Sequence, residues 1–158
     1  MSGVVQGRYW EDFQVGEEWT TGGRTVTEGD VANFAGLVGD YNPLHTDEEF
    51  AKRNPYRRRV AHGFLLASLA SGMVNQMGIY NGTAEAFGRV HFRFLRPVFF
   101  GDTIHNRLRV SEKREGLART QRGVVVFEIK CINHDGKTVF VGGWEMLIKK
   151  KIQALEPK

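Results

Sequence analysis

The chain has 158 residues, of which 41% are hydrophobic and 25% are charged, which is typical of one globular domain and excludes a disordered or fibrous chain. The formal net charge of +4 suits an anionic ligand or nucleic acid, and it is also explained by solubility alone. One cysteine, Cys131, excludes a disulfide within the chain, and the most apolar segment, residues 64–74, is too short to span a bilayer, so we expect a cytoplasmic protein without a membrane partner.

The first part of the chain predicts a strand followed by a helix. Residues 17–26 are expected to form the strand. Thr27 and Asp30 have the spacing of a capping box and precede an amphipathic apolar pattern, which predicts a short helix that Gly39 ends.

Further helical segments follow. Thr46 and Glu49 form a second apparent capping box, which predicts one or two helical turns as far as Arg53, where Asn54-Pro55 stops them. Residues 64–77 are apolar on nearly every face, which predicts a helix buried on all sides.

The second half of the chain changes to a period of two, which indicates strands. Asp135-Gly136 is a strong hairpin signal between the last two. The four expected strands are residues 88–95, 103–110, 123–132 and 137–148. Helices segregated from consecutive antiparallel strands indicate an α+β fold, with the sheet curled around the buried helix. Such a sheet has open edges, so we expect a homodimer or higher homo-oligomer. We expect residues 1–158 to form one domain, with 150–158 as a flexible basic tail.

The stretch "GDYNPLH", residues 39–45, is the strongest candidate for a functional site. It places Asp40, Asn42 and His45 close together, and Pro43 stiffens the loop between them. A site that holds a water molecule between a carboxylate and an imidazole needs this stiffness, whereas a solvated loop does not. Asn42 is expected to shape the loop through a side-chain bond to the backbone rather than to contact substrate.

This stretch, followed after five further residues by Ala51, resembles the signature of the MaoC-like, or type 2 (R)-specific, enoyl-CoA hydratases. "EDFQVGE", "AHGFLLASLAS" and "FRFLRPVFFGDT" resemble further family segments in the expected order, from about residue 10 to residue 148. The family usually has a small residue where this chain has Val38. The resemblance implies a hot-dog fold, a curled antiparallel sheet around a long helix, usually as a dimer.

The resemblance also implies reversible hydration of a trans-2-enoyl-CoA to an (R)-3-hydroxyacyl-CoA. Asp40 and His45 would then be the catalytic pair, with Asp40 as the base and His45 orienting the water. Gly63 opens the buried helix, where an unpaired backbone N–H at the positive end of the dipole suits an oxyanion hole. Ser71 would line the acyl pocket or bond back to its own helix. Coenzyme A is part of the substrate, and the resemblance implies no metal or redox cofactor.

The remaining polar residues are open to two interpretations. Arg57, Arg58 and Arg59 precede the helix and are either phosphate ligands for coenzyme A or solvated loop charges. His62 is expected to cap or pack the start of the helix. The arginines of the strands (Arg89, Arg93, Arg107 and Arg109) are explained by a solvated face or by contacts between subunits.

Other sites and other functions fit less well. The sequence has no EF-hand, structural zinc motif, nucleotide-binding glycine motif or nucleophile elbow, and it lacks the aromatic signature of an RNA-binding sheet. The alternatives are a hydratase for a branched or dicarboxylic (mesaconyl-type) enoyl-CoA, a hot-dog thioesterase, a non-catalytic acyl-CoA-binding or regulatory protein, and a nucleic-acid binder. The Asp40/His45 frame argues against the last three.

Overall fold

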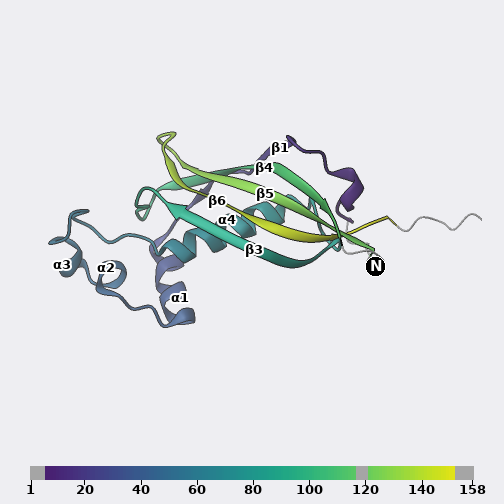
Figure 1. Cartoon of the computed structure of the whole chain (residues 1–158). Helices are drawn as coiled ribbons and strands as arrows, with labels where there is room; N and C mark the ends of the chain where they lie inside the picture. Colours follow the sequence, from purple (N-terminus) through teal and green to yellow (C-terminus); the bar gives the residue numbers. More distant parts are fainter. Residues whose placement is uncertain (1–5, 117–120, 152–158) are drawn as a thin grey trace, which may run out of the picture.

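The computed structural model describes residues 6–116 and 121–151, so most of the expected tail lies outside the described residues. An antiparallel sheet in the order β1–β4–β5–β6–β3 covers one long helix, α4, and three shorter helices lie together at one end of the sheet (Figure 1). The strands are β1 (Glu18–Thr20), β2 (Arg24–Thr25), β3 (Ala84–Phe94), β4 (Thr103–Glu115), β5 (Arg122–Asn133) and β6 (Thr138–Lys149). The helices are η1 (Trp10–Asp12), α1 (Glu28–Val38), α2 (Pro43–Thr46), α3 (Glu48–Ala51) and α4 (Gly63–Gln76). The α+β prediction is confirmed.

The four strands predicted in the second half are confirmed, with shifts at their ends. The β5–β6 hairpin turns at Gly136, whose φ of 76° is in the left-handed region that glycine adopts readily. Asn133 closes this turn, because its side-chain oxygen accepts from the Lys137 N–H at 2.9 Å.

The predicted first strand, residues 17–26, is wrong in its middle. The structure has two short strands, β1 and β2, that both pair with β4. Between the pairs Thr20–Arg107 and Arg24–Ile104, the chain advances four residues against three on β4, so one extra residue must bulge out. Gly22 and Gly23 lie in this stretch, and paired glycines have no side chains with which to hold a regular strand.

The first predicted capping box is confirmed and the second is wrong. The Thr27 hydroxyl accepts from the Asp30 N–H at 3.1 Å, and Gly39 ends α1 with a φ of 78°. At α3, however, the cap is Asp47, whose carboxylate accepts from the Phe50 N–H at 2.9 Å. The Thr46 hydroxyl instead donates to backbone carbonyls in the preceding turn, since a carboxylate is the stronger acceptor for a helix N-terminus.

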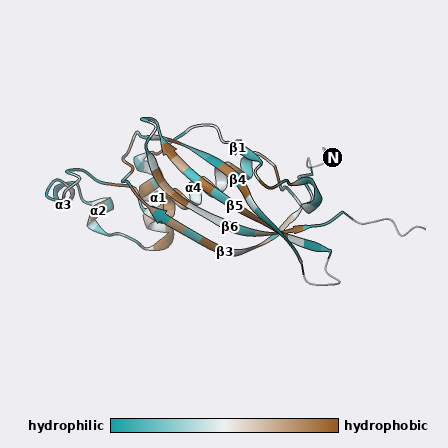
Figure 2. Ribbon diagram, turned by 45° about the horizontal axis from the view of Figure 1, so that its top comes forward, coloured by the Kyte–Doolittle hydropathy of each residue, from teal (hydrophilic) through white to brown (hydrophobic). Residues whose placement is uncertain are grey.

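Helix α4 is buried on one side only. Leu66, Ala70 and Val74 are at most 2% exposed and pack in the core with the sheet residues Phe127 and Trp144. Figure 2 shows hydrophobic residues along the strands and on α4, whereas α2 and α3 are mostly hydrophilic.

The prediction that this helix is buried all round is therefore wrong for the single chain. Phe64 is 76% exposed, and Ser68, Gly72 and Asn75 continue the same exposed face. The reason is that the sheet covers only one side of the helix.

Strand β3 forms an edge of the sheet and exposes apolar side chains. Phe87, Val90 and Phe94 are 44–52% exposed. An edge strand is hydrogen-bonded to another strand on one side only, so neighbouring strands shield its side chains less than those of an inner strand.

None of the helices in the two described ranges is long and apolar enough to cross a membrane.

Candidate active site

A short turn before α2 brings Asp40 and His45 together. Asn42 caps α2, since its side-chain oxygen accepts from the Leu44 N–H at 3.0 Å, and Pro43 occupies the first helical position. The Asp40 carboxylate accepts from the Asn42 N–H at 3.3 Å. The expected structural role of Asn42 thus has a direct counterpart in the geometry.

One hydrogen bond fixes the tautomer of His45. Its Nδ1 lies 2.7 Å from the backbone oxygen of Val60, and a carbonyl oxygen can only accept, so Nδ1 carries the proton. In the neutral ring, Nε2 is then an acceptor. Burial lowers the pKa of His45 below its usual 6.5, although the bond to Val60 opposes this shift, so the neutral ring is favoured.

His62 completes the cluster. This residue is 2% exposed, and its Nε2 donates to the backbone oxygen of Asp40 at 3.0 Å. Its ring lies against the His45 ring, with centroids 3.8 Å apart and planes inclined by 33°. The expectation of a capping role is wrong, because its side chain makes no cap bond at α4. The expected packing role of His62 is confirmed, since the centroids of the His62 and Phe34 rings are 5.2 Å apart. Sequence reasoning missed the link to Asp40, because only the fold brings the two residues together.

Asp40, His45 and His62 are also the one group of three possible metal ligands found among the described residues, with ligand atoms within 4.8 Å of one another. Each imidazole already donates one N–H to a backbone carbonyl, which leaves one nitrogen per ring as a potential ligand. These are Nε2 of His45 and Nδ1 of His62, and the latter is buried without a hydrogen-bond partner among the described residues.

Gly63 is the first residue of α4 and sits directly after His62. In the described part of the chain its backbone N–H has no acceptor within hydrogen-bonding distance, and it lies at the positive end of the helix dipole. A Cβ at this position would lie 3.2 Å from the Phe94 ring. Close packing against Phe94 is therefore a sufficient reason for glycine here, beside any role in binding.

Ser71 lies two turns further along α4 and lines a cavity of about 640 Å³ between this helix and β3. Ser68, Asn75, Phe87 and Met146 also line it. The Ser71 hydroxyl forms no hydrogen bond to its own helix in the described chain. It is therefore available as a polar group in the lining of the cavity.

The three arginines before α4 have different surroundings. Arg59 is held in ion pairs with Glu28 and Glu48, at 2.6 and 2.8 Å. Arg57 has a φ of 61° and donates to the backbone oxygen of Lys52 at 3.4 Å. Arg58 lines a separate cavity near the β3–β4 turn.

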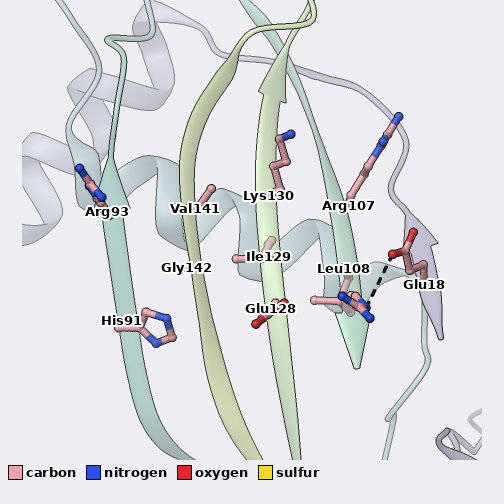
Figure 3. Close-up of a pocket in the computed structure, with 11 residues that line it drawn as sticks. Glu18, His91, Arg93, Arg107, Leu108, Glu128, Ile129, Lys130, Val141 and Gly142 are labelled. Atoms are coloured by element: carbon pink, nitrogen blue, oxygen red, sulfur yellow. Dashed lines mark ion pairs between the residues drawn. The ribbon is translucent and has the colours of Figure 1, made fainter. Parts of the chain in front are cut away.

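A second basic region lies on the face of the sheet turned away from α4 (Figure 3). Arg93, Lys130 and Arg107 line a cavity of about 580 Å³ there, and none of them has a carboxylate partner among the described residues. Arg109 and Glu18 pair across the next row at 3.8 Å. Figure 3 shows the three cations pointing to the same side of the sheet, which fits the expected solvated face.

Comparison with known proteins decides the family. The MaoC-like domain matches residues 12–129 of this chain. The chain belongs to the MaoC-like family. A Mycobacterium tuberculosis protein with a TM-score of 0.79 and 20% identity is described as having a double hot-dog fold, which confirms the predicted fold.

Several curated relatives of this chain are named as hydratases or dehydratases. An (R)-specific enoyl-CoA hydratase from Aeromonas caviae is 40% identical over 86 residues, which are 54% of this chain and 63% of that protein. Alignments cover only 31–64% of the length of three of the curated relatives.

Two solved structures are similar over nearly their whole length. A monoamine oxidase regulatory protein from Archaeoglobus fulgidus has a TM-score of 0.87 and 38% identity, and the match covers 94% of this chain and 98% of that one. The R-hydratase PhaJ1 from Pseudomonas aeruginosa has a TM-score of 0.76 and 28% identity over 98% and 97% of the two chains.

Proposed function

We propose that this protein catalyses the reversible hydration of a trans-2-enoyl-CoA to an (R)-3-hydroxyacyl-CoA. The observation that carries the proposal is the hydrogen bond from His45 Nδ1 to Val60, which leaves Nε2 as an acceptor beside the Asp40 carboxylate. The names of the hydratase relatives support the same reaction.

Two acceptors side by side suit a water nucleophile. A water molecule that donates one O–H to Asp40 and the other to His45 Nε2 keeps its lone pairs free to attack. In the proposed reaction the water oxygen bonds to C3 of the enoyl group while Asp40 takes one water proton. That proton then goes to C2, which completes the addition and restores the carboxylate. His45 orients the water and stays neutral, and positioned groups of this kind contribute roughly 10²–10⁴-fold.

The thioester oxygen becomes negatively charged when C3 is attacked. We propose that the free N–H of Gly63 binds this oxygen, since a backbone donor at a helix N-terminus needs no reorganisation. The acyl chain would enter the cavity lined by Ser71, whose floor includes Phe87 and Met146. Every step uses side chains and backbone of the protein, and coenzyme A takes part only as the substrate's carrier.

We further propose that the protein acts as a homodimer or higher homo-oligomer. Asp40 is exposed in the single chain, and a second copy would exclude bulk water from the reacting groups. Strand β3 offers an open edge with apolar side chains, and the exposed face of α4 begins at Phe64. Pairing of two such surfaces would bury both.

The test is a hydration assay with crotonyl-CoA, which follows loss of the conjugated enoyl absorbance and the chirality of the product. We expect wild type to form the (R)-alcohol, and Asp40→Asn and His45→Gln to lose about 10²–10⁴-fold in kcat. Glu49→Gln is the matched control, because Glu49 is an exposed carboxylate nearby whose only ion pair within residues 6–116 and 121–151 is with Lys52, at 2.6 Å. Equal activity of all four proteins, or no turnover by wild type with short, long or branched enoyl-CoAs, would refute the proposal.

A regulatory role is the second candidate, because the Archaeoglobus structure similar to this chain is named as a regulatory protein. A non-catalytic acyl-CoA binder would bind crotonyl-CoA without consuming it, and its affinity would be unchanged by Asp40→Asn. If the protein is a hydratase, Asp40→Asn would still bind crotonyl-CoA but would no longer convert it.

A further inference from the structure

A cavity of about 510 Å³ lies where three connections of the fold meet. These are the loop before α4, the β3–β4 turn and the β5–β6 turn, and Figure 1 shows both turns at the same end of the sheet as α1, α2 and α3. The lining residues are Arg58, Arg96, Pro97, Phe99, Asp102, Asn133, His134, Asp135 and Lys137. The proposed hydration chemistry uses none of them.

The lining favours an anion. Arg96 donates to the backbone oxygen of Thr138 at 2.7 Å and, within the described ranges, has no carboxylate partner, so most of its N–H groups are available. Lys137 is paired only with the exposed Asp135, at 3.6 Å. Asp102 accepts from the Phe99 N–H at 3.0 Å and pairs with Arg58 at 4.0 Å, so its charge is already balanced inside the cavity.

The cavity also offers a surface for a planar ring. The guanidinium carbon of Arg58 lies 3.8 Å from the centroid of the Phe99 ring. Tyr56 meets the same ring edge-on at 6.5 Å. Arginine and aromatic faces of this kind stack on nucleic-acid bases, and arginine also matches phosphate geometry.

Two hydrogen bonds to backbone carbonyls connect this cavity to the candidate active site. Arg58 is two residues before Val60, whose carbonyl accepts from His45, so their Cα atoms are at most about 7 Å apart. Phe99 follows Val98, whose carbonyl accepts from the Ala61 N–H at 2.9 Å. Ala61 is in turn two residues before Gly63. A pantetheine arm can span this separation.

We propose that the cavity binds the 3′-phosphorylated ADP portion of coenzyme A, with Arg96 and Lys137 on phosphates and the adenine against Arg58 and Phe99. This inference rests on the proposed function, and it selects the coenzyme A thioester over a carrier-protein thioester as the substrate. It also divides the arginine triplet, since Arg58 binds the nucleotide whereas Arg59 holds the loop through Glu28 and Glu48.

The test compares two substrates that differ only in the nucleotide, crotonyl-CoA and crotonyl-pantetheine. For Arg96→Ala we expect KM for crotonyl-CoA to rise about tenfold at unchanged kcat, because one charged hydrogen-bond donor is lost, and KM for crotonyl-pantetheine to stay the same. Arg96→Lys should recover part of the affinity, since it keeps the charge without the planar fork. For wild type, added salt should raise KM for crotonyl-CoA but not KM for crotonyl-pantetheine, which lacks the charged nucleotide.

Arg107→Ala is the matched control, because Arg107 is an exposed arginine that lines the other basic cavity. A tenfold rise in KM for Arg107→Ala but not for Arg96→Ala, or equal effects of Arg96→Ala on both substrates, would overturn the proposal. Thermal melts identify any variant that fails to fold, and Lys137→Ala then replaces it.

Failure of the proposed hydration is separable from failure of this inference. If neither substrate is hydrated, calorimetric titration with adenosine 3′,5′-bisphosphate still tests the cavity. Binding to wild type that Arg96→Ala weakens about tenfold supports the site, and no binding, or equal binding to both, overturns it.

Discussion

Replacing Gly63 by proline removes one N–H and tests whether that donor acts in catalysis. Proline is well tolerated at the first helical position, which Gly63 occupies. The preceding His62 has φ −62° and ψ 138°, a conformation that a residue before proline readily adopts. The substitution therefore deletes the proposed oxyanion donor and leaves the helix able to form.

Gly63→Ala is the matched control, because alanine adds the same Cβ but keeps the N–H. That Cβ would lie 3.2 Å from the Phe94 ring, at least 0.2 Å inside the ordinary contact range of 3.4–4 Å. Overpacking costs about 1–3 kcal/mol in a rigid core, but Phe94 is 44% exposed and can move, so we expect about 1 kcal/mol for both variants. Their Tm values should fall together, by about 2–4 °C.

The two variants should differ in activity. Loss of one oxyanion donor costs about 10²–10³-fold in kcat, so Gly63→Pro should be slower than Gly63→Ala by that factor with crotonyl-CoA. Both variants carry the same Cβ, so the ratio of the two rates reports the replacement of the N–H by the proline ring. Equal rates would refute the oxyanion role and leave packing against Phe94 as the reason for glycine.

Three further predictions concern the cluster and the assembly. Because burial holds the pKa of His45 below 6.5, kcat/KM should fall as pH drops through that lowered pKa, where Nε2 gains a proton, and the midpoint of the fall should lie below pH 6.5. A midpoint above pH 6.5 would contradict the lowered pKa. His62→Phe keeps the stacked ring but loses the bond to Asp40, so kcat should fall about tenfold, and in an Asp40→Asn background the same change should have no further effect. Val90→Lys places a charge on the open β3 edge and should convert the dimer to monomers in sedimentation, whereas Val141→Lys on an inner strand should not; a wild-type monomer would refute the proposed pairing.

Local signals predicted part of the site well. Asn42 and Pro43 act through bonds within two residues, so the sequence is sufficient to predict the turn that places Asp40 near His45. The error at Thr46 was also local, because two adjacent residues could each cap α3 and the carboxylate of Asp47 is the stronger acceptor.

The sequence by itself determined the periods, the turns and the motif, because these depend on neighbours along the chain. It therefore predicted the α+β arrangement, the helix ended by Gly39 and the hairpin at Gly136. Only the tertiary structure decided what depends on distant segments. His62 meets Asp40 and His45 because α4 docks beside the turn, and Phe64 remains exposed because the sheet covers only one side of that helix. The different surroundings of Arg58 and Arg59 likewise depend on Phe99 and Glu28, which lie far away in the chain and close in the fold.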